Sequence, residues 1–233
     1  MRYINTPELI EKYPTLTSGV ILARNIENGP SPLKVDEMLN SIEAHVSSFE
    51  PATLSRHPHI SSWRQAYSSF GVKPSRYNSA AESLLRRVLK EGHLPRLNAL
   101  VDICNLISLK YILPVAAYDL SKIVGDVQVG LAEGDERFLP LYAEGAERPD
   151  PGEVVYRDSE KALSRRWNWR ISHEARVTEE TKEALMTVEG LNLIPRGKVE
   201  AATFELKELI ERFLRADVKY AILDKDRPWV DWD

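Results

Sequence analysis

Apolar residues recur every three to four positions in several parts of the chain, which is the spacing of one face of an α-helix. This spacing predicts six helices, at residues 7–12, 35–46, 60–70, 79–92, 97–111 and 204–214. Shorter apolar or alternating segments predict eight strands, at residues 19–23, 115–119, 124–131, 136–141, 153–157, 166–171, 184–189 and 218–223. Helices and strands in this irregular order predict an α+β fold, in which mixed or antiparallel sheets pack against helices.

The composition is that of a folded globular protein, because 43% of the 233 residues are hydrophobic and 28% are charged. The longest apolar run, residues 111–118, is interrupted by Pro114 and is far shorter than the ~20 residues of a membrane-spanning helix. The start of the chain resembles no secretory signal, so we expect a cytoplasmic protein without membrane contact. The single cysteine, Cys104, allows no internal disulfide, and its apolar surroundings predict a place in the core.

The net charge of −4 is unevenly distributed along the chain. Residues 64–123 carry nine Lys/Arg against four Asp/Glu, and residues 161–177 carry five against one. The segment between them, residues 124–160, carries three against ten. Two basic blocks that met in the fold would form a surface able to hold phosphates, whereas the simpler interpretation is ordinary solvated charge.

The chain lacks the short signatures of the common enzyme classes. It has no G-x-S-x-G nucleophile elbow, no phosphate-binding P-loop, no G-x-G-x-x-G after a strand and no H-E-x-x-H zinc motif. His57 and His59 could ligate a metal only with ligands from distant segments, and we expect them to lie in an ordinary loop. The sequence therefore predicts no metal and no cofactor.

The predicted helix 97–111 is apolar on nearly every side, which is typical of a buried helix. Asn98, Asp102 and Asn105 nevertheless follow one another at i, i+4 and i+7, so their side chains share one face. Either this face is exposed to solvent at the edge of the fold, or it forms the wall of a cleft. A buried polar stripe needs hydrogen-bond partners, which a ligand or bound water can supply.

Residues 165–170 read Arg-Arg-Trp-Asn-Trp-Arg and form a second unusual segment. If this segment is a strand, Trp167 and Trp169 share one of its faces. The other face then carries Arg166, Asn168 and Arg170. Aromatic rings beside cations suit the stacking of a nucleobase and the binding of a phosphate. The alternative is a tryptophan pair in the core with a solvated basic face.

Four motifs occur in the order found in the editing region of the bacterial phenylalanyl-tRNA synthetase β subunit, called the B3/B4 domain. They are L-P-R-L-N-A-L-V-D-I-C-N at 94–105, L-P-V-A-A-Y-D at 113–119, G-E-V-V-Y-R-D at 152–158 and V-T-E-E-T at 177–181. The chain most closely resembles free-standing members of that family. The resemblance covers residues 62–215, with an N-terminal helix and strand layer at 1–61 and a C-terminal strand and tail at 216–233.

In the synthetase, this domain hydrolyses the ester between a wrong amino acid, typically tyrosine, and the 3′ adenosine of the tRNA. The resemblance implies that Asn105 matches an asparagine lining the editing pocket, and that Cys104 matches the small polar residue before it. Two places depart from the synthetase pattern. Ala116 stands where synthetase members have a histidine, and residues 167–170 replace a glycine-rich stretch.

The resemblance implies a stand-alone hydrolase that acts on mischarged aminoacyl-tRNA, while nothing in the chain resembles the aminoacylation module of a complete synthetase. The residues assigned to catalysis are Asn105, Asp102, Asn98 and Glu174. Either Glu174 or its neighbour His173 corresponds to a glutamate in the pocket of the synthetase. The residues assigned to the substrate are Trp167, Asn168, Trp169, Arg170, Ala116 and Cys104, and those assigned to tRNA phosphates are Arg86, Arg87 and Lys90. Two other functions stay open: a non-catalytic module that binds RNA or a small metabolite, and a hydrolase of small amino-acid esters or amides.

Overall fold

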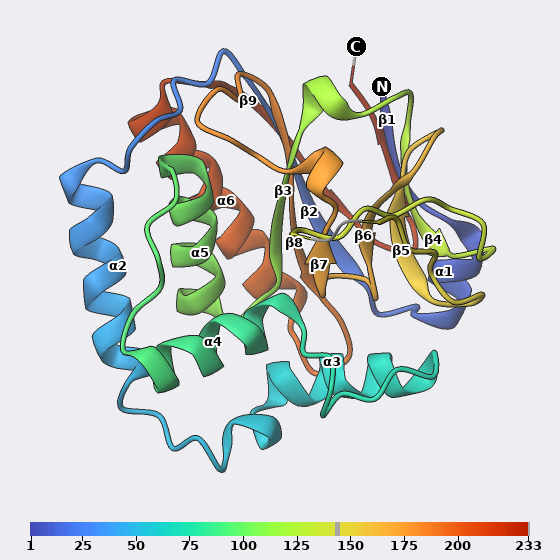
Figure 1. Cartoon of the computed structure of the whole chain (residues 1–233), viewed down its shortest axis with the longest axis horizontal. Helices are drawn as coiled ribbons and strands as arrows, with labels where there is room; N and C mark the ends of the chain where they lie inside the picture. The colour runs from blue at the N-terminus through green and yellow to red at the C-terminus, as the bar shows by residue number, and fades with distance from the viewer. Residues whose placement is uncertain (143–144, 233) are drawn as a thin grey trace.

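The computed structural model describes residues 1–142 and 145–232, and its strands form two sheets (Figure 1). The strands are β1 (Arg2–Asn5), β2 (Thr17–Arg24), β3 (Val115–Asp119), β4 (Val127–Leu131), β5 (Val154–Arg157), β6 (Ala162–Arg165), β7 (Arg170–Ile171), β8 (Ala184–Gly190), β9 (Asp217–Leu223) and β10 (Trp229–Asp231). One sheet has the order β10-β1-β4-β5-β6-β7, and the other β3-β8-β2-β9. β1 and β4 run parallel, and the other strand pairs in the described part of the chain are antiparallel. The sheets confirm the predicted α+β fold.

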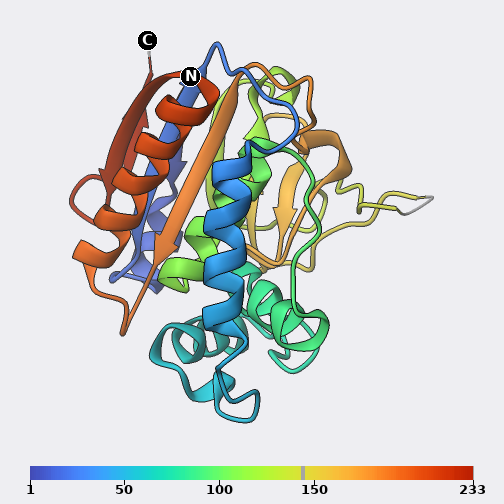
Figure 2. The same ribbon diagram turned by 90° about the vertical axis from the view of Figure 1, so that its left-hand side faces the viewer.

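The helices pack mainly on one face of the four-stranded sheet. They are α1 (Pro7–Lys12), α2 (Leu33–Val46), α3 (Pro58–Ser69), α4 (Ala80–Glu91), α5 (Ala99–Tyr111) and α6 (Arg196–Leu214), with short 3-10 turns η1 (Leu54–Arg56), η2 (Leu120–Lys122) and η3 (His173–Ala175). α5 and α6 contact each other and this sheet, and α2 covers α5 from outside (Figures 1 and 2). α3 and α4 close one end of the molecule. The six-stranded sheet faces the other side of the four-stranded sheet, where Tyr156 of β5 donates a hydrogen bond to Thr187 of β8.

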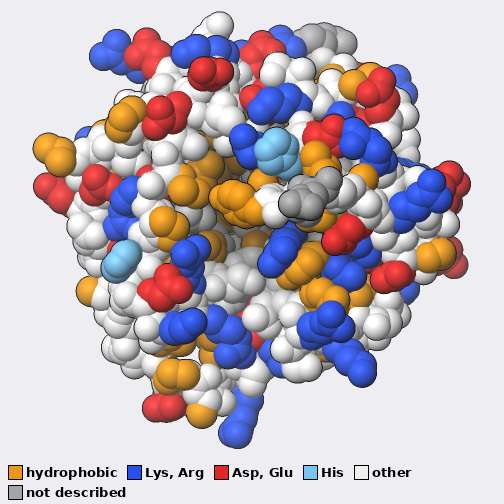
Figure 3. Space-filling view, viewed as in Figure 1, with side chains coloured by type: hydrophobic (Ala, Val, Ile, Leu, Met, Phe, Trp, Pro, Cys, Tyr) orange, Lys and Arg blue, Asp and Glu red, His pale blue; other side chains and the backbone are white. Residues whose placement is uncertain are grey.

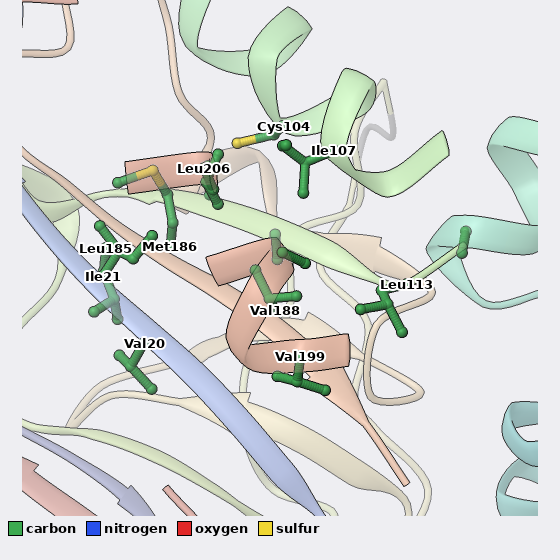
Figure 4. Close-up of a cluster of buried hydrophobic side chains, with 14 of the residues drawn as sticks. Val20, Ile21, Cys104, Ile107, Leu113, Leu185, Met186, Val188, Val199 and Leu206 are labelled. Carbon is green, nitrogen blue, oxygen red and sulfur yellow. The ribbon is translucent and has the colours of Figure 1, made fainter. Parts of the chain in front are cut away.

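The core lines both faces of the four-stranded sheet, toward the helices on one side and toward the six-stranded sheet on the other. Figure 4 shows Cys104 and Ile107 of α5 in one cluster with Met186 and Val188 of β8. All four side chains are buried. The prediction that Cys104 packs in the core is confirmed.

Local sequence signals set several helix ends. The Thr6 hydroxyl accepts a hydrogen bond from the Leu9 N–H at 3.4 Å and starts α1. The Ser79 hydroxyl likewise accepts from the Glu82 N–H at 3.3 Å and starts α4. Gly92 ends α4 in the left-handed conformation, with a φ of 84°. These short-range contacts explain why the predicted helices are close to the observed ones.

α6 begins at Arg196, well before the predicted start at residue 204. The additional turns bury Val199 and Thr203 against the sheet. The helix approaches β2 so closely that a Cβ on Gly19 would lie 1.8 Å from the Thr203 hydroxyl oxygen. The first turn of α6 contains charged residues and a glycine, so the spacing of apolar residues did not predict it as helix. Burial against a strand distant in sequence stabilises it instead.

The prediction of a strand at 136–141 is wrong. In this segment Phe138 forms an isolated bridge to Glu147, and the flanking residues belong to no strand. The Glu136 carboxylate accepts hydrogen bonds from the backbone N–H groups of Glu133 and Gly134, which curls the chain instead of extending it. Pro140, which has no N–H to donate, further limits sheet pairing.

The prediction of one strand at 166–171 is also wrong, because residues 166–169 form the turn between β6 and β7. Arg166 and Trp167 have left-handed φ angles of 47° and 62°. The Trp167 indole is fully buried, whereas Trp169 is partly exposed. The two tryptophans therefore do not share a strand face. The local alternation of polar and aromatic residues carried no information about the tight turn that long-range contacts impose.

Both ends of the chain are built into the sheets. β1 and β10 pair in antiparallel register, and the Met1 carbonyl accepts the Trp232 N–H at 3.0 Å. β2 lies between β8 and β9 in the four-stranded sheet. The segments outside residues 62–215 thus contribute strands to both sheets, beside the strands of the central segment.

Candidate functional site

A cavity of about 590 Å³ opens beside α5, where that helix meets the end of β7 and the loop 176–179. Figure 3 shows the hollow in the middle of one face of the molecule, with hydrophobic side chains gathered along its edge. Its walls are formed by Leu97, Asn98, Val101, Cys104 and Asn105 next to and on α5, by Val115 and Ala117 of β3, and by Leu141, Tyr142, Ile171, Arg176, Val177 and Glu179. The volume is that of a small-molecule site, and its apolar walls carry a few polar groups, as such sites usually do.

Asn98 is the N-cap of α5 and one of the two amides in the cavity wall. Its side-chain oxygen accepts hydrogen bonds from the Val101 N–H and from the Asn28 amide nitrogen, both at 3.1 Å. Asn28 also donates to the Thr178 carbonyl at 2.8 Å, so it ties the start of α5 to the loop that forms the opposite wall. The amide nitrogen of Asn98 has no partner among the described residues and can donate into the cavity.

Asn105 lies two turns further along α5 and is half-buried in the same wall. No described residue forms a hydrogen bond with its side chain. A partly buried amide normally finds partners in the protein or in water. Asn105 therefore presents an unpaired donor and an unpaired acceptor to whatever occupies the cavity.

Asp102, the third member of the predicted stripe, does not line the cavity. Its carboxylate accepts hydrogen bonds from the Ser31 hydroxyl at 2.5 Å and from the Leu97 N–H at 3.1 Å. Burial raises the pKa of Asp102, and the bonds from Ser31 and Leu97 partly offset this rise. The stripe thus divides: Asn98 and Asn105 face the cavity, while Asp102 holds the loops at the start of the helix.

Cys104 and Ala116, two of the residues assigned to the substrate, lie on different sides of β3. Cys104 is on the side of the cavity, and Ala116 is on the opposite side. Cys104 lines the cavity, but burial raises the pKa of its thiol to about 12, so the reactive thiolate is not available near neutral pH. Val115 and Ala117 of β3 line the cavity, and side chains alternate along a strand. Ala116 accordingly lies on the opposite face of β3, where it is the partner of Thr187 across the ladder.

Trp167 and Asn168 belong to a buried network between the two sheets and not to the cavity wall. The Trp167 indole donates a hydrogen bond to one carboxylate oxygen of Glu189 at 2.8 Å, and the Asn168 amide donates to the other at 3.3 Å. The Asn168 side-chain oxygen accepts from the Tyr67 hydroxyl at 2.9 Å. Burial raises the pKa of Glu189, although its interactions with Tyr156 and with these two residues oppose the rise.

The other predicted substrate residues, Trp169 and Arg170, lie at the surface directly before the cavity-lining Ile171. The Arg170 guanidinium is 4.5 Å from the centre of the Trp169 ring. Glu174 lies on η3, bound to Arg137, and lines no part of the cavity; its neighbour His173 uses its backbone N–H to bind the Leu139 carbonyl. The geometry brings neither of these two residues to the amides of α5.

The three cations proposed to meet phosphates are on α4, and two of them, Arg86 and Arg87, have carboxylate partners on the same helix. Arg86 pairs with the buried Glu82 at 2.7 Å, and Arg87 pairs with Glu91 at 2.9 Å. The hydrogen bond from Arg87, with a smaller effect of Lys90, lowers the pKa of Glu91. Because Glu82 also pairs with Arg64 at 2.6 Å and Lys90 has no carboxylate partner among the described residues, the positive charge of this surface is only partly balanced.

Three residues were not singled out from the sequence: Arg176 and Glu179, which line the cavity, and Asn28, which binds the cavity-lining Asn98. The Arg176 guanidinium has no carboxylate partner among the described residues, and Glu179 supplies the carboxylate of the described lining. Glu179 belongs to the motif at 177–181, which carries the family resemblance and could have indicated it. The motif has no regular spacing of polar residues that would single out Glu179 within it. Asn28 gave no signal, because only the fold brings its turn to α5.

Within residues 1–142 and 145–232, no group of three His, Cys, Asp or Glu side chains is placed to hold a metal ion. His57 is the N-cap of α3, where its ring nitrogen accepts the His59 N–H at 3.3 Å, so the two histidines belong to a helix start and not to a loop. No helix in the described part of the chain has the length and apolarity to cross a membrane.

The sequence is similar to known proteins of one family. Residues 62–213 match the family model described as the B3/4 domain. The phenylalanine–tRNA ligase β subunit of Aliivibrio fischeri is 32% identical over 111 residues, which are 47% of this chain and 14% of that protein. The corresponding subunit of Fusobacterium nucleatum is 31% identical over 40% of this chain and 11% of its own length. That of Shewanella oneidensis is 29% identical over 36% of this chain and 10% of its own length.

An N-terminal fragment of the phenylalanyl-tRNA synthetase β subunit from Pyrococcus horikoshii is similar in structure over 93% of this chain and 49% of that one. The TM-score is 0.43 and the sequence identity 14%. The sequence matches to the bacterial subunits thus span about a tenth to a seventh of those proteins.

Proposed function

The chain belongs to the B3/4 domain family, and on this premise we propose that it hydrolyses the ester bond of a mischarged aminoacyl-tRNA in the cavity beside α5. The observation that supports this proposal most directly is the unpaired amide of Asn105, half-buried in a cavity of about 590 Å³. The space suits an aminoacyl group with part of its ribose. Most of the wall is apolar, which favours an apolar amino-acid side chain.

The reaction is an attack of water on the ester carbonyl, which gives a tetrahedral intermediate and then the free amino acid and the ribose hydroxyl. The amide nitrogens of Asn105 and Asn98 would donate hydrogen bonds to the developing oxyanion, and the Arg176 guanidinium would add a positive charge. Glu179 would accept the proton of the attacking water. No covalent nucleophile is needed, and the raised pKa of Cys104 disfavours its thiolate in that role.

The proposal is tested by incubating the purified protein with a panel of mischarged tRNAs and, separately, with free aminoacyl esters. Asn105→Ala should lower the single-turnover deacylation rate by about 10²- to 10³-fold, the usual effect of deleting one oxyanion donor. Gln65→Ala is the matched control, because Gln65 is an exposed amide on α3 that does not line the cavity. Hydrolysis of esters but not of tRNA would assign the small-ester function, and unchanged turnover in Asn105→Ala would remove Asn105 from the site.

A second candidate is a module that binds RNA or a small metabolite without catalysis. The observation in its favour is the place of Asp102, whose carboxylate is held by Ser31 and Leu97 and does not reach the cavity as a base. This function predicts saturable binding of aminoacylated RNA with no release of the amino acid. The same preparation, assayed for both binding and release, separates the two candidates.

A further inference from the structure

The surface between the α3–α4 loop and the turn 166–169 carries three arginines alternating with two aromatic rings. We call this set the arginine–aromatic ladder; it consists of Arg76, Tyr77, Arg166, Trp169 and Arg170. The Arg166 guanidinium is 3.9 Å from the centre of the Tyr77 ring and 4.7 Å from that of Trp169. Arg76 lies 5.2 Å from Tyr77, and Arg170 lies 4.5 Å from Trp169, so a cation stands at each end.

The centre of the ladder is fixed by buried contacts. Arg166 adopts a left-handed φ of 47°, and its backbone N–H donates to a buried Glu153 oxygen at 2.7 Å. The adjacent Trp167 is anchored in the core, so the turn cannot move freely. The rings of Tyr77 and Trp169 meet edge to face, with centres 4.9 Å apart. A platform held in this way loses little conformational freedom when a ligand binds.

The two ends of the ladder remain available to a ligand. Arg76 and Arg170 are exposed, and neither has a carboxylate partner among the described residues. The central Arg166 is different, because Asp150 and Glu153 lie 3.9 Å and 4.0 Å from it. The terminal guanidinium groups thus keep their charge for an anion.

The ladder also lies next to the cavity along the chain. Arg170 and Ile171 form β7, and Ile171 lines the cavity. Figure 3 shows Lys and Arg side chains around and below the hollow on this face. β7 therefore joins the ladder to the cavity wall, with Arg170 and Ile171 on opposite faces of the strand.

We propose that the arginine–aromatic ladder binds the single-stranded 3′ end of an RNA, with phosphates on Arg76 and Arg170 and bases stacked on the outward guanidinium planes of these two arginines. Single-stranded RNA is recognised by this combination, because every base has a flat face and every nucleotide a phosphate. An acidic peptide would use the charge but would offer no flat ring to stack on the guanidinium planes that Tyr77 and Trp169 hold in place. The inference rests on the proposed function only for the choice of a tRNA-like probe.

The test compares two RNA hairpins, one with a short single-stranded 3′ end and one with a blunt end, by fluorescence anisotropy over a range of salt concentrations. The double variant Arg76→Gln/Arg170→Gln changes only exposed side chains and should fold. We expect it to bind the hairpin with the single-stranded end at least about fivefold more weakly than the wild type. Loss of two phosphate contacts should also reduce the slope of log affinity against log salt by about 1.4.

Arg212→Gln is the matched control, because the Arg212 guanidinium is exposed and lies 5.2 Å from the Phe213 ring on α6, outside the ladder. This variant should bind both hairpins like the wild type. Equal affinity of the wild type for the two hairpins, or an unchanged salt slope in the double variant, would overturn the inference. Displacement of the RNA by an equal concentration of poly-glutamate would overturn it in favour of an acidic peptide.

These outcomes are separate from those of the deacylation assay. A wild-type protein that binds the single-stranded end but releases no amino acid supports the ladder and refutes the proposed reaction. A protein that hydrolyses the ester equally well in the wild type and the double variant, at RNA concentrations below saturation, supports the reaction and refutes the ladder.

Discussion

The buried carboxyl group of Glu189 gives a prediction about stability and pH that can be worked out from the structure. Glu189 is almost fully buried between the sheets, and burial raises its pKa above the ordinary 4.5. The folded state therefore keeps a proton on this group at pH values where the unfolded chain has lost it. Stability from this group is complete below the unfolded pKa and is lost as the pH rises through the folded pKa.

We expect the free energy of unfolding of the wild type, relative to Glu189→Gln, to fall as the pH rises above 4.5. Between the unfolded and the folded pKa, the difference should change by about 1.4 kcal/mol per pH unit, the value for one proton. Glutamine has a similar shape, cannot ionise in this range and retains an oxygen that can accept from Trp167. Other titrating groups are the same in both proteins, so their effects cancel in the difference.

The measurement is urea denaturation of both proteins at a series of pH values, with the midpoint and the slope fitted separately. The analysis holds only where the slope is the same in the two proteins. Two stability curves that stay parallel from pH 4 to 8 would refute the reasoning, because they would show that Glu189 has the same pKa in the folded and unfolded states.

Two further substitutions test the packing that positions the site. Gly19→Ala should destabilise the protein by about 1–3 kcal/mol, because its new Cβ would lie 1.8 Å from the Thr203 hydroxyl oxygen, whereas Gly29→Ala, with nothing within 4 Å, should change stability little; urea denaturation measures both. Trp167→Phe should cost about 1–3 kcal/mol by leaving an oxygen of Glu189 without its indole donor, and thermal melting at pH 7 should show this loss.

The helices were predicted well because their signals are local. The spacing of apolar residues and the caps at Thr6 and Ser79 act within one or two turns, so a sequence window contains them. The wrong strand at 136–141 reflects local contacts of Glu136 that the apolar pattern does not show, whereas the wrong strand at 166–171 failed for the opposite reason. Glu153, distant in sequence, binds the turn at Arg166, and no local pattern announces that contact.

The candidate site was partly predictable. Asn98 and Asn105 were found from their spacing on a helix that is otherwise apolar, and the structure places both in the cavity wall. Asp102 has the same spacing but faces Ser31, because the loop before α2 crosses the helix there. Periodicity assigns a residue to a face of a helix, and only the fold determines which neighbour covers each part of that face. The same limit applies to Arg176, which the chain brings to the cavity from a segment without regular structure.

The cavity and the ladder are held by one connected set of buried groups. Glu153 fixes the backbone of Arg166, and Glu189 fixes Trp167 next to it, so both carboxylates position the turn between β6 and β7. That turn sets where Arg170 and the cavity-lining Ile171 emerge. Buried carboxylates are costly to desolvate, and apolar residues of similar size would often be no less stable. Their presence here is consistent with the proposal that the turn between β6 and β7 positions a ligand-binding surface, a role that stability alone does not require.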